Sequence, residues 1–209
     1  IPSFELIQSN TDGLIVRVLT EDFEHLRSVC SEWESRTKFN LDVDDIQEIW
    51  QKDVNNYVFT SIGKDGNIEI ERKGGYVKAT NELDNDLPIV SRALVDYMVN
   101  KVPVETTIMS SNDLIDFQKI VKTSSKYKCA WHKGNYLHNK VNRVFASRYN
   151  DGYIGKIKTD GATIEKFANT PDNCFIDNSN IIGKKCPVRL DRQYYIDMAT
   201  KRLSEFGAI

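Results

Sequence analysis

An Asp-Gly pair, Asp12-Gly13, separates two apolar and β-branched runs within residues 4–19. Such a pair favours a tight turn between two strands, because glycine adopts a positive φ without strain. The pattern therefore predicts a β-hairpin with Asp12 at its tip. The second arm, residues 14–19, is apolar at nearly every position and predicts a strand buried on both faces.

Asp12 is a candidate metal ligand, because a carboxylate at the tip of a rigid hairpin can hold a divalent cation through hard oxygen ligands. The alternative is that Asp12 only forms the turn, as most Asp-Gly pairs do. The residues of the hairpin by themselves leave both interpretations open.

The composition is that of an ordinary globular protein, with 209 residues, 40% hydrophobic and 28% charged. No apolar run approaches the ~20 residues of a membrane span, and no signal peptide is apparent. The four cysteines and three histidines are scattered without the spacing of a zinc site. We expect free thiols in a reducing cytoplasm and no membrane partner.

Charge divides the chain into two unlike halves. Residues 1–100 carry 10 Lys and Arg against 19 Asp and Glu, whereas residues 101–209 carry 18 against 11. This asymmetry predicts two regions with different partners.

The most polarised segment is 117–148, which holds eight basic residues and no acidic one. Lys and Arg neutralise phosphates and give affinity for nucleic acid that does not depend on its sequence. Aromatic residues lie between them and can stack on unpaired bases, although such residues more often serve a core. The alternative to a nucleic-acid surface is a solvated basic face. The eight candidates for DNA contact are Lys119, Lys122, Lys126, Lys128, Lys133, Lys140, Arg143 and Arg148.

Periodicity predicts both helices and strands along the rest of the chain. Thr20 is a predicted N-cap, and Cys30 and Trp33 are predicted to lie in the core. Ser110 or Ser111 is expected to cap the third helix. The predicted helices cover 23–33, 86–102, 112–121 and 190–206. The predicted strands cover 38–44, 55–62, 67–72, 127–131, 141–146, 153–157 and 174–176.

The segment Ser9-Asn-Thr-Asp-Gly13 resembles motif C of family-B DNA polymerases, Tyr-x-Asp-Thr-Asp-Ser. Asp12 falls on the second aspartate, which binds the catalytic metals in that family. The chain departs from the motif where Gln8 replaces the tyrosine, Asn10 the first aspartate and Gly13 the serine.

Later segments extend this resemblance in order along the chain. Asn55-Asn56-Tyr57 occupies the place of the Lys-x-Tyr motif, and Lys73-Gly74 that of a later Lys-Gly. The resemblance implies that Tyr57 lies near the primer strand, with Lys52 as a substitute for the missing lysine. Residues 89–105 resemble the start of the thumb in phage polymerases, and 190–206 its C-terminal Asp-x-x-Tyr-Tyr-Ile helix.

The resemblance implies an α+β fold, in which 1–83 form an antiparallel palm sheet portion with a flanking helix and 84–209 a mixed helical and β thumb. It implies a DNA-directed DNA polymerase that uses Mg²⁺, dNTP and primer–template DNA, with Asp12 as catalytic metal ligand. Motif A is missing, so we expect an upstream polymerase portion with motif A, the fingers and any exonuclease domain. The chain alone is expected to be inactive, and a phage origin would place it in the cytoplasm of a bacterial host.

Two other functions stay open from the sequence. A non-catalytic nucleic-acid-binding module would need only the basic segment, with Asp12 confined to the turn. A metal-dependent nuclease would need clustered carboxylates, for which Asp42, Asp44 and Asp45 are the candidates. The alternation of residues 38–44 argues against the nuclease, because it places Asp42 and Asp44 on a polar strand face.

Overall fold

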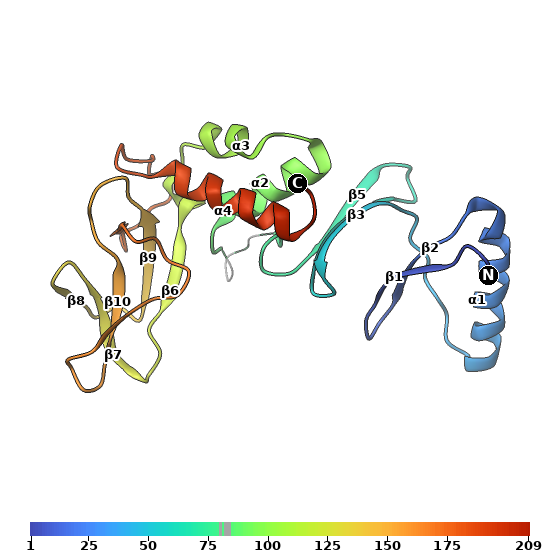
Figure 1. The fold of residues 1–209 in the computed structure, drawn as a ribbon, viewed down its shortest axis with the longest axis horizontal. Helices are drawn as coiled ribbons and strands as arrows, with labels where there is room; N and C mark the ends of the chain where they lie inside the picture. The colour runs from blue at the N-terminus through green and yellow to red at the C-terminus, as the bar shows by residue number, and fades with distance from the viewer. Residues whose placement is uncertain (80, 82–84) are drawn as a thin grey trace. The chain divides into compact units, whose positions relative to one another are not determined.

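The computed structural model describes residues 1–79, 81 and 85–209. The chain forms two compact units, the N-terminal unit Ile1–Glu71 and the C-terminal unit Arg72–Ile209. Four α-helices and twelve strands in antiparallel sheets are present among the described residues, which confirms the expected α+β class (Figure 1). The predicted boundary between 83 and 84 falls outside the described residues.

The N-terminal unit opens with the predicted hairpin. Strand β1 (Glu5–Ser9) pairs antiparallel with β2 (Leu14–Arg17), with Ser9 opposite Leu14 at the turn. The expected burial of the second arm on both faces is wrong, because β2 belongs to a two-stranded sheet and Leu14 is 64% exposed. A two-stranded ribbon has too few neighbours to cover both of its faces.

A 3₁₀ turn, η1 (Thr20–Asp22), leads into helix α1 (Phe23–Thr37). The predicted N-cap is wrong by two residues, since Thr20 starts η1 and Asp22 occupies the N-cap of α1. The carboxylate of Asp22 accepts hydrogen bonds from the amide and hydroxyl of Ser3. This contact ties the start of the chain to the helix and leaves the cap without a side-chain bond.

The expectation that Trp33 and Cys30 belong to a core is also wrong, because α1 buries none of its residues. Trp33 lies partly exposed and stacks on Phe39, with the ring centroids 6.3 Å apart. The amide of Leu41 donates to Oε1 of Glu34 at 2.6 Å. These contacts hold the segment after α1 back against the helix.

The predicted strand at residues 38–44 does not form, and all of these residues are exposed. Lys38 takes a left-handed conformation, with φ of 64°, and ends α1. No strand among the described residues pairs with residues 38–44, so their alternating pattern does not form part of a sheet.

The second sheet of the chain has the order β3-β4-β5. It consists of β3 (Ile46–Asp53), β4 (Asn56–Ile62) and β5 (Ile68–Lys73), the last crossing the division between the two units. The hairpin predicted for β4 and β5 is confirmed, whereas β3 was not predicted as a strand. Among residues 1–71, all of which are described, the buried hydrophobic side chains are Tyr57, Val58 and Phe59 on β4.

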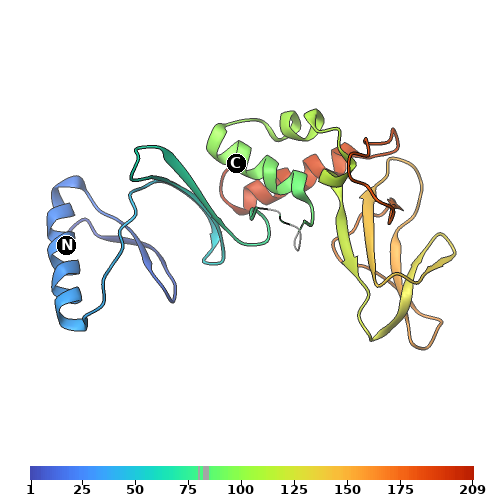
Figure 2. The same cartoon turned by 180° about the vertical axis from the view of Figure 1, so that it is seen from behind.

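The C-terminal unit contains three α-helices that pack against one another (Figures 1 and 2). Helix α2 (Pro88–Asn100) begins with proline at its first turn, where a missing N–H costs little, as predicted. Helix α4 (Arg192–Glu205) is capped by Asp191, whose carboxylate accepts from the amides of Gln193 and Tyr194. Both helices were predicted from their periodicity and end signals. Helix α3 (Val104–Ser110) was not predicted from the sequence.

The helix predicted over 112–121 is wrong. Ser110 ends α3, and the chain then forms a short 3₁₀ turn, η2 (Leu114–Phe117), and strand β6 (Lys119–Lys122). Strand β6 pairs with β9 (Val141–Ala146), whose β-branched and aromatic residues suit a sheet. The long-range pairing with β9 therefore overrides the local helical pattern.

Two further sheets complete the C-terminal unit, with strand orders β12-β9-β6 and β11-β10-β7-β8. Strands β7, β9, β10 and β12 lie where they were predicted, within one residue. The short strands β8 and β11 were not predicted. Their bounds are β7 (Tyr127–His132), β8 (Asn135–Leu137), β10 (Ile154–Lys158), β11 (Ile164–Lys166) and β12 (Cys174–Ile176).

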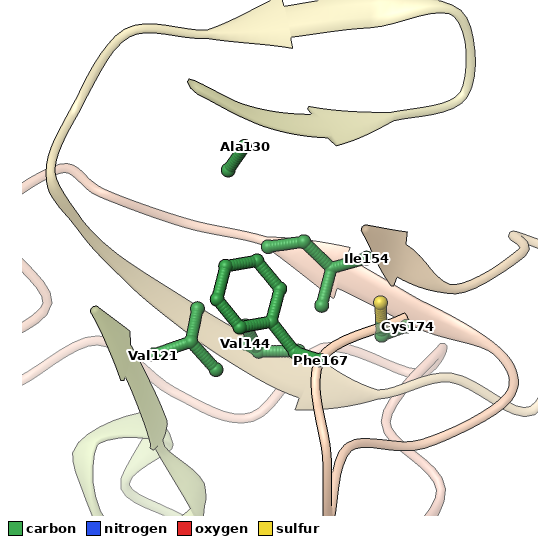
Figure 3. Close-up of a cluster of buried hydrophobic side chains, with 6 residues drawn as sticks. All are labelled: Val121, Ala130, Val144, Ile154, Phe167 and Cys174. Carbon is green, nitrogen blue, oxygen red and sulfur yellow. The ribbon is translucent and has the colours of Figure 1, made fainter. Parts of the chain in front are cut away.

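A compact apolar cluster lies between strands of these two sheets (Figure 3). Half-buried Leu137 and Ile176 pack against its edge. Its buried members are Val121, Ala130, Val144, Ile154, Phe167 and Cys174. The cluster fixes the positions of β6, β7 and β9, which carry Lys119, Lys122, Lys128 and Arg143 of the basic segment. Among the described residues, no helix is long and apolar enough to span a membrane.

Candidate nucleic-acid interface

Asp12 lies at the exposed tip of the β1–β2 hairpin, as predicted. The turn closes through Asn10, whose Oδ1 accepts hydrogen bonds from the amides of Asp12 and Gly13, each at 2.9 Å. Gly13 does not adopt a positive φ, so the expected reason for glycine at this turn is wrong. The Asn10 side chain sets the turn instead, in the manner of an Asx turn.

Gln8, which falls on the tyrosine of the polymerase motif, is buried on β1. Its Oε1 and Nε2 atoms have no hydrogen-bond partner among the described residues. A buried amide without partners costs free energy, because its bonds to water are not replaced.

A metal site is not complete within the described residues. They contain no group of three His, Cys, Asp or Glu side chains that could hold a metal ion. The nuclease candidates Asp42, Asp44 and Asp45 are exposed in the segment after α1. Mg²⁺ prefers near-octahedral oxygen coordination, and Asp12 alone supplies one carboxylate. The described residues therefore do not fit a self-sufficient Mg²⁺ site.

Tyr57 is buried on β4, and its ring stacks on Phe59 with centroids 5.9 Å apart. Burial raises the pKa of its hydroxyl, and nearby Glu71 raises it further. Lys52 lies on β3, with Nζ 3.9 Å from Asp53. In this structure the Tyr57 ring contributes to packing, since little of it is exposed.

Two of the eight predicted basic residues form ion pairs with carboxylates of the C-terminal unit. Nζ of Lys119 lies 2.6 Å from Oδ2 of Asp86, and Nζ of Lys133 lies 2.6 Å from Oδ1 of Asp151. Both acidic partners lie outside the acid-free segment. The sequence could not reveal these pairs, because folding brings together residues that are distant along the chain.

Asp151 is a buried carboxylate at the centre of a polar cluster that the sequence did not predict. Its side chain is only 6% exposed and also accepts from Ser147 Oγ and Arg189 Nη2, both at 2.5 Å. The bonds from Lys133, Ser147 and Arg189 hold the pKa of this carboxyl well below its ordinary range. Arg189 also lies over the ring of Phe175, 5.0 Å from its centroid. This cluster fixes Lys133 and joins the loop after β9 to the segment before α4.

Lys122, Lys140 and Arg143 gather at one end of the β6–β9 pair. Lys122 lies opposite Val141 and Arg143 opposite Ile120, so Lys122 and Arg143 are diagonal neighbours on one face. The amide of Thr123 donates to the carbonyl of Lys140 at 2.8 Å, which places Lys140 beside the end of β6. Lys122 and Lys140 are exposed and Arg143 is half-buried.

A shallow groove of about 280 Å³ runs beside the end of β6. Lys156, which the sequence argument missed, lies over the ring of Tyr127, with Nζ 4.2 Å from the centroid. Its Nζ also lies 3.8 Å from Oε2 of Glu165, so among the described residues the unpaired positive charge at the groove comes from Lys122. The lining residues are Lys119, Ile120, Val121, Lys122, Ser124, Tyr127, Lys156, Phe167 and Ala168.

The remaining predicted residues lie on the surface of the same unit. Lys126 is exposed before β7, and Lys128 lies on β7 with Nζ 6.0 Å from the ring of Tyr136. Arg148 is exposed and donates from Nη2 to the carbonyl of Leu190 at 3.4 Å. Exposed cations on one sheet edge and one groove can bind a phosphate backbone without sequence preference.

Protein-family models, curated protein sequences and solved structures were compared with this chain, and none matched it.

Proposed function

We propose that this chain is the C-terminal palm and thumb portion of a family-B DNA-directed DNA polymerase that grips primer–template duplex through its basic segment. The observation that carries this proposal is the set of cations left free of acidic partners. Among the described residues, no carboxylate forms an ion pair with Lys122, Lys126, Lys128, Lys140, Arg143 or Arg148. Unpaired cations on a surface release counterions when they meet phosphates, and this release supplies affinity.

Asp12 has a separate role in this proposal. Its exposed position on a turn closed by Asn10 suits a ligand offered to a site completed elsewhere. An upstream polymerase portion with motif A and the fingers would bring the other Mg²⁺ ligands and the dNTP site. The function of the metal there would be to stabilise charge during nucleotidyl transfer. A phage-encoded protein of this kind would act in the cytoplasm of its bacterial host.

Salt-dependent binding tests the DNA grip. Fluorescence anisotropy of a labelled primer–template duplex, titrated from about 50 mM to about 200 mM salt, gives the slope of log K against log[salt]. The double variant Lys122→Gln/Lys140→Gln should reduce the magnitude of that slope by about two, because each lost phosphate contact removes about one unit.

The matched control for this experiment is Lys185→Gln. Lys185 is an exposed lysine of the same unit, but its Nζ lies 2.7 Å from Asp113. Its slope should equal that of the unmodified chain. An equal decrease of the slope in the double variant and in Lys185→Gln would contradict a particular role of Lys122 and Lys140 in DNA binding. No binding at low salt would overturn the proposed function.

A non-catalytic nucleic-acid-binding module is the second candidate, because the unpaired cations of the basic segment would serve it without any metal ligand. Primer extension separates the two. In the presence of an upstream polymerase portion, Asp12→Asn should abolish synthesis and leave duplex binding unchanged. Unchanged synthesis would support the module. Synthesis by this chain without added protein would contradict the requirement for an upstream portion.

A further inference from the structure

One face of the β11-β10-β7-β8 sheet carries aromatic side chains. Trp131 on β7 lies directly opposite Tyr136 on β8 and opposite Gly155 on β10. Directly opposed residues of antiparallel strands point to the same face. Tyr136, Trp131 and Gly155 therefore form a row across three strands.

Tyr153 extends this row. Its ring centroid lies 6.1 Å from that of Trp131, at an interplanar angle of 51°. A Cβ on Gly155 would lie 3.4 Å from Cε2 of Tyr153 and 2.5 Å from Cγ2 of Ile164, so both side chains cover the glycine. Glycine at this position lets the aromatic side chains lie low on the sheet. We call Trp131, Tyr136 and Tyr153 the aromatic platform.

The aromatic platform is not part of the core cluster of this unit. Ala130 and Ile154 belong to that cluster (Figure 3), and Leu137 packs against it. All three alternate with residues of the aromatic platform and therefore point to the opposite face. Tyr136 is 55% exposed and Tyr153 36%, while Trp131 is half-buried. On the same face as Trp131, Cys129 and Ile157 are buried. Tyr136 and Tyr153, in contrast, keep exposed aromatic surface that is available to a ligand.

The charge beside the platform is positive. A register shift between Ile157 and Lys158 makes Lys128 the extra residue of β7, and its Nζ lies 6.0 Å from the ring of Tyr136. Among the strands of this sheet, the acidic residue is Glu165. Its carboxylate contacts Tyr127 and Lys158 on the face opposite the aromatic platform. Lys166, opposite Gly155, pairs with Asp172. The platform thus combines flat π surfaces with an adjacent free cation.

We propose that the aromatic platform binds single-stranded DNA by stacking two or three unpaired bases on Trp131, Tyr136 and Tyr153, with Lys128 at the phosphates. Base–aromatic stacking tolerates any sequence, because every base has a π face. A duplex cannot use this surface in the same way, since its bases are already stacked on one another. The inference goes beyond the proposed duplex grip and does not require it.

The test is anisotropy with a labelled oligo-dT of about 16 nucleotides, a length that one sheet module can bind. Tyr136→Ala should weaken binding about tenfold. Trp131→Phe keeps a ring and should retain most of the affinity, whereas Trp131→Ala should not. Tyr149→Ala is the matched control, since Tyr149 is 51% exposed in the same unit but lies in the loop after β9. It should leave binding unchanged.

A second measurement checks that a loss of binding does not come from unfolding of the variant. Circular dichroism should show the same melting temperature for Tyr136→Ala and Tyr149→Ala, because both side chains are exposed. Equal affinity of these two variants for oligo-dT, or no binding of oligo-dT at low salt, would overturn the inference. Retained duplex binding in that case leaves the proposed function standing. Loss of duplex binding with retained oligo-dT binding would overturn the proposed function and leave the inference about the aromatic platform standing.

Discussion

The hydroxyl of Tyr195 donates a hydrogen bond of 2.8 Å to the backbone carbonyl of Phe117. The same oxygen accepts from the amide of Ala146 at 3.1 Å, and the two rings of Tyr195 and Phe117 meet edge to face with centroids 5.1 Å apart. One buried side chain of α4 thereby joins η2 to the end of β9. Burial raises the pKa of this hydroxyl far above its ordinary value, so it stays protonated and can donate.

We expect Tyr195→Phe to destabilise the chain by about 1–3 kcal/mol, because it leaves two buried backbone groups without partners. Urea denaturation gives the free energy of unfolding. Tyr149→Phe removes an exposed hydroxyl and should change that free energy by less than about 0.5 kcal/mol. Equal effects in the two variants would show that the Tyr195 hydroxyl contributes nothing.

Asp151→Ala should lower the free energy of unfolding by about 1–3 kcal/mol, because it leaves the hydroxyl of buried Ser147 without its acceptor and removes the partner of Lys133 and Arg189. The comparison is Asp172→Ala, which removes an exposed carboxylate paired with Lys166 and should cost at most about 1 kcal/mol. A cost for Asp151→Ala no larger than for Asp172→Ala would contradict the central role of this cluster.

The same carboxyl predicts a pH dependence. The pKa of Asp151 is lowered in the folded chain, mainly by the hydrogen bonds from Lys133 and Ser147, so the folded state favours the charged form. Its contribution is fully present above the unfolded pKa of about 3.9 and is lost as the pH falls through the folded pKa. The difference in unfolding free energy between the unmodified chain and Asp151→Asn should therefore shrink below about pH 4. A difference that stays constant between neutral and acidic pH would contradict this assignment.

Asn10→Ala should loosen the β1–β2 turn, because the amides of Asp12 and Gly13 lose their acceptor. Amide hydrogen exchange at Gly13 should become faster. Asn10→Asp keeps an acceptor oxygen and should retain the slower exchange. Identical exchange in the Ala and Asp variants would mean that the side chain does not close the turn.

Local signals predicted the elements whose ends are marked by particular residues. Asp12-Gly13 marked the place of the first hairpin, although the side chain of Asn10 closes its turn, Pro88 marked the start of α2 and Asp191 the cap of α4. Each acts within a few residues of itself, so the sequence is sufficient to reveal it.

The predicted helix at 112–121 is wrong because a distant segment decides the outcome, through the pairing of β6 with β9. The predicted strand at 38–44 is wrong for a local reason, since Phe39 and Leu41 contact α1 just before them in the chain. In the candidate interface, the sequence showed an acid-free segment but not the pairing of Lys119 with Asp86 or Lys133 with Asp151. Such pairs depend on tertiary packing, which charge counting along the chain does not include.

The exposed apolar side chains of the N-terminal unit affect how freely its sequence can change. Leu14, Val43 and Ile68 are each more than half exposed, so their replacement by serine removes little buried surface. Folding of this chain therefore places little selective constraint on those three positions. If related sequences nevertheless keep them apolar, the constraint comes from a surface that covers them in the cell.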